Sequence, residues 1–173
     1  IKKISKVKPL LILMKVCPII DLELEKFFTE LRFIILFANF ELDTLDNYYN
    51  FLSAFSIQLF INEHLYNESD IETKKISELS QKISSNISLN KKTSEIDLIK
   101  LSLYRPLHIL DGIDKIRFTE HFQLLAKRLI YEPISEFKNL SNFKSLKKIS
   151  NKVSLLVRDL YEESPYPRWI KPG

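Results

Sequence analysis

The side chains with the most chemical capacity lie together near the carboxyl end, in the stretch Tyr161-Glu-Glu-Ser-Pro-Tyr-Pro-Arg-Trp169. Pro165 and Pro167 fix their own φ and push the residue before each of them toward extended backbone, so the chain cannot be helical at these positions. Its aromatic rings are costly to leave in water, and the arginine beside Trp169 can stack on the indole or clamp an anion. We predict a stiff strap over residues 161–173 that lies across another polypeptide surface. Packing against the chain's own helices is the alternative.

A second polar group stands within strongly apolar sequence. Asn62 falls on an apolar face of the helix predicted for residues 47–66, and Glu63 adjoins it. A buried amide without partners costs about 1–3 kcal/mol, so Asn62 is expected to be hydrogen-bonded. Arg105 follows Tyr104 at a helix end, where it can satisfy free carbonyls or pair with an acid such as Glu63. We predict a buried polar network of these four residues, serving either as a polar pocket or, as is more common, as a structural pin.

No catalytic residue can be assigned. The chain holds only two glycines, which excludes a glycine-rich phosphate or dinucleotide loop. His64, His108 and His121 have no partners at metal-ligand spacing, so a structural or surface role is expected for each and no metal site is predicted. Cys17 lies in apolar sequence that disfavours the thiolate, and no serine has the setting of a nucleophile.

The elements that must position these residues are helices. Apolar residues recur at spacings of three and four, which predicts one all-α domain of about six helices over residues 1–160. Asp21 and Asp46 are predicted N-caps, residues 84–93 a loop, and Pro133 a helix end. The predicted helices cover 21–37, 47–66, 71–84, 94–104, a stretch from 114 or 119 to 131, and 142–163.

The last predicted helix has two distinct faces. Its apolar stripe consists of Leu146, Ile149, Val153, Leu156, Val157 and Leu160. Lys144, Lys148 and Lys152 lie opposite, with Leu155 among them. A solvated basic face is the simpler interpretation, and Leu155 is a possible contact for a neighbouring domain.

Charge and hydropathy limit the partners. The net charge of +4 is small and evenly spread, so no nucleic-acid partner is predicted. The most apolar segment, residues 9–20, is too short to span a bilayer, so no membrane partner is predicted. The single cysteine fits a reducing compartment, and we expect a cytoplasmic protein.

Several of these motifs resemble one family. The 161–169 strap, preceded by Val157-Arg158, is similar to the segment that leads into the catalytic domain of bacterial class I S-adenosylmethionine-dependent methyltransferases, in which tetratricopeptide repeats often stand upstream. Phe-Ile-Asn-Glu-His-Leu-Tyr at 60–66 and Tyr-Arg-Pro-Leu at 104–107 resemble the family's Asn-Glu helix and Tyr-Arg-Pro-Leu step. Pro133 with Glu136 resembles a further turn, and the matches run in order from about residue 20 to 171.

The chain departs from that family in two side chains. Ser164 stands where the family usually carries asparagine, and His64 where it usually carries tyrosine.

The resemblance implies a helical region that ends as a catalytic domain begins. That domain would bind S-adenosylmethionine in the full-length protein, whereas no cofactor is expected in this chain. The residues expected near cofactor or acceptor are Tyr161, Pro165, Tyr166, Pro167, Arg168 and Trp169. Tyr161 and Trp169 would wall the pocket, and Arg168 would pair with a carboxylate or orient a strand. A non-catalytic helical module that recruits a protein partner is the alternative.

Overall fold

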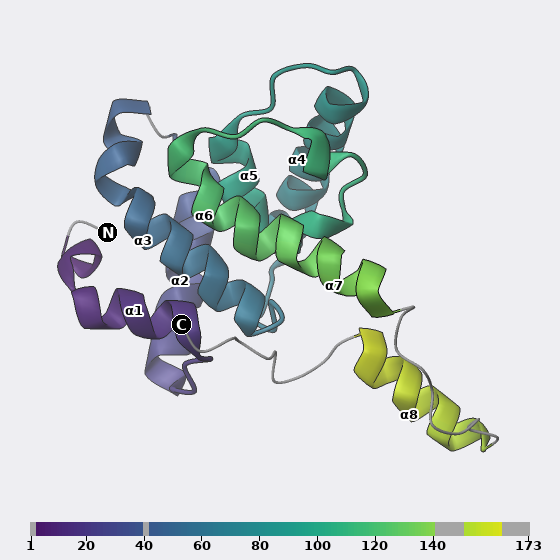
Figure 1. Cartoon of the computed structure of the whole chain (residues 1–173). Coiled ribbons are helices and arrows are strands. Elements are labelled where there is room, and N and C mark those ends of the chain that lie inside the picture. Colours follow the sequence, from purple (N-terminus) through teal and green to yellow (C-terminus); the bar gives the residue numbers. More distant parts are fainter. Residues whose placement is uncertain (1–2, 40–41, 141–150, 164–173) are drawn as a thin grey trace.

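The structure is a computed structural model that describes residues 3–39, 42–140 and 151–163. These residues form helices and turns without any strand, so the predicted all-α class is confirmed. The α-helices are α1 (Lys8–Val16), α2 (Leu22–Phe37), α3 (Leu42–Ile61), α4 (Asp70–Ser88), α5 (Glu95–Ser102), α6 (Gln123–Ala126), α7 (Glu132–Leu140) and α8 (Lys152–Glu163) (Figure 1). Short 3₁₀ turns at Ile4–Lys6, Leu107–Ile109, Ile113–Lys115 and Glu120–Phe122 join them, and a π-helical segment, η5 (Lys127–Tyr131), connects α6 to α7.

Helix α3 forms the centre of the core. Every residue from 51 to 61 is buried, as expected for a helix that is apolar on all sides. It contacts α1, α5, α6 and η5, and the rings of Phe51 and Phe28 both pack against Phe55. The all-round apolar pattern of this segment therefore specifies a central position.

A buried amide joins α1 to this core. Gln58 on α3 is fully buried, and the surrounding backbone groups assign its amide orientation: the side-chain nitrogen then donates to the carbonyl oxygens of Met14 and Cys17 at 3.1 and 3.0 Å. Its oxygen accepts from the backbone N–H of Ile19 at 3.0 Å. All three partners lie at the end of α1 or just after it, so Gln58 satisfies backbone groups where the helix ends.

The boundaries of α3 correct two predictions. The helix begins at Leu42, so position 46 lies inside it and Asp46 is not its N-cap. It ends at Ile61 and not near Tyr66, because Glu63 and His64 adopt left-handed backbone with φ of 53° and 55°. Such a backbone cannot continue a right-handed helix.

The N-cap of α2 agrees with its prediction, and α4 has a cap that was not predicted. The carboxylate of Asp21 accepts from Leu24 N at 2.8 Å, so the predicted cap of α2 is confirmed. Ser69 and Glu72 form a reciprocal capping box at the start of α4. That helix continues to Ser88, so the first half of the predicted 84–93 loop is wrong. Ile87, within the added turn, packs against the core.

The predicted helix end at Pro133 is also wrong. The chain passes from α6 through the π-helical η5 into α7, and Pro133 is buried in the first turn of α7. Proline has no N–H to donate to the carbonyl four residues earlier, and its ring crowds that carbonyl. A π-turn just before it shifts the hydrogen-bond pattern and lets the helix continue.

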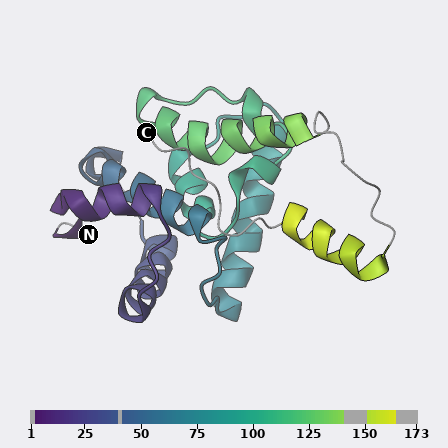
Figure 2. The same ribbon diagram turned by 60° about the horizontal axis from the view of Figure 1, so that its bottom comes forward.

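Helix α8 lies outside the body formed by the other helices in both ribbon views (Figure 1 and Figure 2). It was predicted to begin near residue 142, but it begins at Lys152, because the side chain of Asn151 accepts from the backbone N–H groups of Val153 and Ser154. Positions 141–150 lie outside the described residues. The end of α8 at Glu163 agrees with the prediction.

Candidate functional site

The predicted strap is described only at its first residues. Tyr161 lies in the last turns of α8 with 62% of its surface exposed, so the extended strap predicted from residue 161 does not include residues 161–163. The other predicted strap residues, namely Pro165, Tyr166, Pro167, Arg168 and Trp169, lie outside the described residues.

Tyr104, from the predicted polar network, lies in a buried cluster with Glu72 and Arg32. Its hydroxyl donates to Glu72 Oε1 at 2.6 Å, and the Arg32 guanidinium stacks over its ring at 4.1 Å from the centroid. Arg32 Nη2 lies 3.8 Å from the same carboxylate oxygen, with both side chains almost fully buried. Burial alone would raise the pKa of Glu72, but hydrogen bonds from Tyr104 and Ser69 and the Arg32 charge outweigh it and hold that pKa below its ordinary value.

Arg105 makes both kinds of contact predicted for it, but with a different acid. Its guanidinium donates to both carboxylate oxygens of Glu68, at 2.7 and 2.9 Å, and to the carbonyl of Tyr104 at 2.8 Å. Glu68, and not Glu63, is thus its carboxylate partner, since the segment after α3 brings residue 68 to the end of α5. These two parallel hydrogen bonds between the guanidinium and the carboxylate join the turn after α5 to the segment that precedes α4.

Asn62 and Glu63 occupy the turn that ends α3. Asn62 is half-buried, and its backbone donates to Gln58 O and accepts from Leu65 N. The fully buried amide of this region is Gln58, one turn earlier, which carries the pinning role that the sequence suggested for Asn62.

The rings of His64 and His108 both pack against Phe60, and His121 lies elsewhere. His64 Nε2 is 3.1 Å from the Ser102 carbonyl oxygen. The ring of His108 packs between Phe60 and Phe137, and His121 lies against Tyr49. Within the described ranges, no group of three or more His, Cys, Asp or Glu side chains could hold a metal ion.

The apolar stripe of α8 is left open. Its described members are Val153 at 67% exposed, Leu156 at 61%, Val157 at 45% and Leu160 at 62%. The predicted outlier, Leu155, is only half-exposed. A row of apolar side chains on one helix face is typical of a surface that another polypeptide covers.

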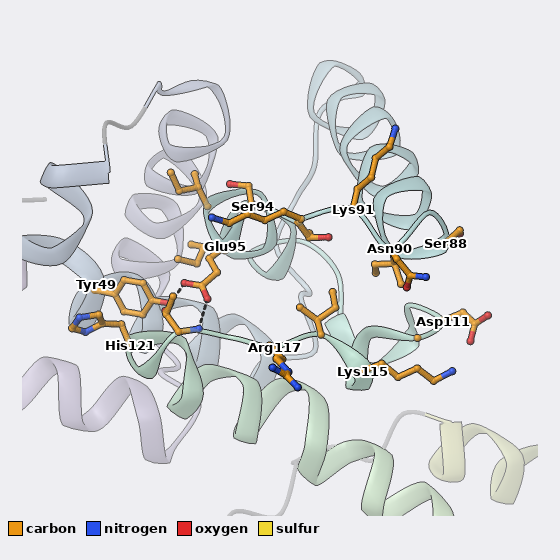
Figure 3. Close-up of a pocket in the computed structure, with 18 residues that line it drawn as sticks. Tyr49, Ser88, Asn90, Lys91, Ser94, Glu95, Asp111, Lys115, Arg117 and His121 are labelled. Atoms are coloured by element: carbon orange, nitrogen blue, oxygen red, sulfur yellow. Dashed lines mark hydrogen bonds between the residues drawn. The ribbon is translucent and has the colours of Figure 1, made fainter.

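A pocket of about 1170 Å³ opens between the end of α4, the start of α5 and the 111–121 segment. Glu95 lies in its middle, with Tyr49 and His121 on one side and Asp111 and Lys115 on the other (Figure 3). This site was not predicted from the sequence, because residues 84–93 were interpreted as a loop. The signal was present in Lys91-Lys92-Thr93-Ser94, two cations and two hydroxyls directly before a helix.

The pocket floor is polar and tightly arranged. Glu95 accepts from the backbone N–H and the hydroxyl of Thr119, both at 2.7 Å, which holds the 111–121 segment against α5. Tyr49 is buried, and burial, with the nearby Glu95 charge, raises the pKa of its hydroxyl well above the ordinary value. Tyr49 therefore keeps its proton across the physiological range.

No known protein family, curated protein or solved structure matches the chain. Within the part of the chain that the structure describes, none of the helices combines the length and the apolar character needed to cross a bilayer.

Proposed function

We propose that this chain is the helical part of an S-adenosylmethionine-dependent methyltransferase and scaffolds a catalytic domain that follows it. The observation that carries the proposal is the open apolar face of α8, the helix that includes the first residues of the 161–169 segment. The resemblance of the strap, the 60–66 segment and the 104–107 step to that family supplies the chemistry.

The energetics favour a covered α8. Fully burying one leucine or valine side chain is worth about 1.5–3 kcal/mol. Val153, Leu156 and Leu160 each keep more than three-fifths of their surface exposed, so a domain seated on them gains several such contributions. The helical body provides the anchor, because α3 and the Glu72–Tyr104–Arg32 cluster are rigidly packed.

In this proposal α8 positions the strap over the catalytic domain near the cofactor or acceptor. Tyr161 and Trp169 would wall the pocket and exclude water, while Arg168 would pair with a carboxylate. S-adenosylmethionine would be held by the following domain and would supply the methyl group. The helical part orients the acceptor and performs no bond-breaking step.

The test uses the full-length protein read from the gene beyond residue 173. We expect amide exchange in α8 to be slower there than in the 1–173 chain, and Leu156→Ser with Leu160→Ser to weaken S-adenosylmethionine binding or lower kcat/KM. Leu65→Ser is the matched control, because Leu65 is 69% exposed and belongs to the turn after α3.

Deleting residues 165–169 should lower activity or cofactor affinity in the same assay. Unchanged kinetics in both variants would overturn the proposal. Capture of a separate protein by α8, with no methyl transfer by the full-length chain, would establish the interaction-module alternative instead.

A further inference from the structure

Two buried hydroxyls in the pocket have no hydrogen-bond partner among the residues that the structure describes. Tyr49 and Thr93 are each 91% buried, both line the pocket, and neither Tyr49 Oη nor Thr93 Oγ1 is hydrogen-bonded. Leaving a buried donor unsatisfied costs about 1–3 kcal/mol. Two such groups facing one cavity are typical of a site that a ligand completes.

The start of α5 adds further donors. Ser94 occupies the N-cap position, yet its side chain makes no cap hydrogen bond, whereas Asp21 and Ser69 cap α2 and α4. The first-turn N–H groups of α5 are thus left without a side-chain acceptor, beside a helix end that favours negative charge. Thr93 and Ser94, which precede these groups in the chain, also line the pocket.

The charges of the lining favour an anion. Four exposed cationic side chains, namely Lys91, Lys92, Lys115 and Arg117, face two carboxylates, Glu95 and Asp111. Both oxygens of Glu95 are occupied by Thr119, so this acid fixes the wall of the pocket. The cations come from two separate segments of the lining, 91–92 and 115–117.

An apolar wall completes the lining. Ile87, Ile96, Ile99 and Ile116 lie among the polar groups. Gly112 adopts a left-handed backbone with φ of 73°, and a Cβ there would lie 3.2 Å from the Ile87 side chain. This glycine lets the 111–117 segment approach α4 closely, which shapes the side of the pocket.

We propose that this pocket binds a small organic phosphate monoester. The tetrahedral dianion offers several acceptors to the hydroxyls of Tyr49 and Thr93, the first-turn N–H groups and the surrounding cations. The isoleucine wall takes the organic part. Buried hydroxyls at the floor of a concave site are reached by a compact ligand, whereas an extended polyanion meets only the exposed lysines.

The experiment titrates the 1–173 chain with phenyl phosphate, inorganic phosphate and benzyl alcohol, followed by NMR of backbone amides. Phenyl phosphate should bind with shifts confined to residues 49, 87–99 and 111–121, more tightly than inorganic phosphate, and benzyl alcohol should not bind. Lys115→Gln and Thr93→Val should each weaken phenyl phosphate by about tenfold. Lys115 is exposed, so its replacement leaves the fold intact.

Lys74→Gln is the matched control, since it removes the same charge from the exposed face of α4 roughly 20 Å from the pocket. Equal weakening by Lys74→Gln, or no saturable shift with phenyl phosphate, would overturn the proposal. Binding of an oligonucleotide that Thr93→Val leaves unchanged, without phenyl phosphate binding, would show a polyanion surface in its place. These measurements need no methyl transfer, so they stand apart from the proposed function.

Discussion

The carboxylate of Glu72 is shared by polar groups from three parts of the chain. It accepts from the Tyr104 hydroxyl, from Ser69 N at 2.8 Å and from Ser69 Oγ at 2.7 Å, and its charge faces Arg32. One carboxylate thus fixes the start of α4, the end of α5 and a side chain of α2. The sequence pointed to Tyr104 as polar and buried, but its partners lie 32 and 72 positions away from it along the chain and carry no local signal.

Replacing Glu72 by glutamine should destabilise the protein by about 3 kcal/mol near neutral pH, because the Arg32 charge stays buried without its carboxylate. The folded-state pKa of Glu72 lies below the ordinary value of 4.5, so the folded protein binds fewer protons than the unfolded chain. The stabilisation is therefore complete above that value and is lost as pH falls through the folded pKa.

Urea unfolding from about pH 7 to about pH 3 measures this loss. The difference in unfolding free energy between wild type and Glu72→Gln should shrink as the pH falls below 4.5. Glu78→Gln, at an exposed position of the same helix, should leave both stability and its pH dependence almost unchanged. A constant difference across the pH range would contradict this account.

At the scale of elements, some helix ends are set by side chains next to them in the sequence, and others are set by packing against distant parts of the chain. Asp21 begins α2 as predicted, because its carboxylate meets a first-turn N–H within three residues. Asp46 has the same residue type, but the helix starts four positions earlier at Leu42. Pro133 ends no helix, since η5 accommodates it. A capping residue or a proline thus marks a position where a helix can begin or end, and the packing around it determines whether it does.

Asp21→Ala should lower the free energy of unfolding by about 1 kcal/mol, since Leu24 N–H loses its acceptor. Asp21→Asn should recover most of this loss, because the amide oxygen can accept the same hydrogen bond. Chemical unfolding of the three proteins gives the comparison. Equal destabilisation by alanine and asparagine would assign the effect to charge and not to the cap.

At the scale of the whole molecule, the fold class followed from hydrophobic periodicity, while the assembly of distant segments did not. The pocket illustrates this, because its lining comes from residue 49, residues 87–99 and residues 111–121. Each segment alone is an ordinary helix end or turn. Gln58 is a similar case, since its neighbours on α3 are apolar and only the placement of α1 shows its role.

Gln58→Leu should detach α1 from the core, because three backbone groups between Met14 and Ile19 lose their partner. The single cysteine, Cys17, reports this directly. We expect its reaction with a thiol reagent, and amide exchange over residues 8–19, to accelerate at least about tenfold, while α4 and α5 are unchanged. Gln81→Leu, at an exposed position of α4, is the control. Equal thiol reactivity in the two variants would show that Gln58 does not hold α1 against the core.

Because its walls are drawn from α3, α4, α5 and the 111–121 segment, the pocket exists only while these elements are assembled. A compound that fills it must therefore raise the melting temperature of the body, by an amount that grows with concentration. At a hundredfold excess over Kd the added stability is about 2.7 kcal/mol. Thermal-shift screening of a metabolite library can thus find the natural occupant before any reaction is known.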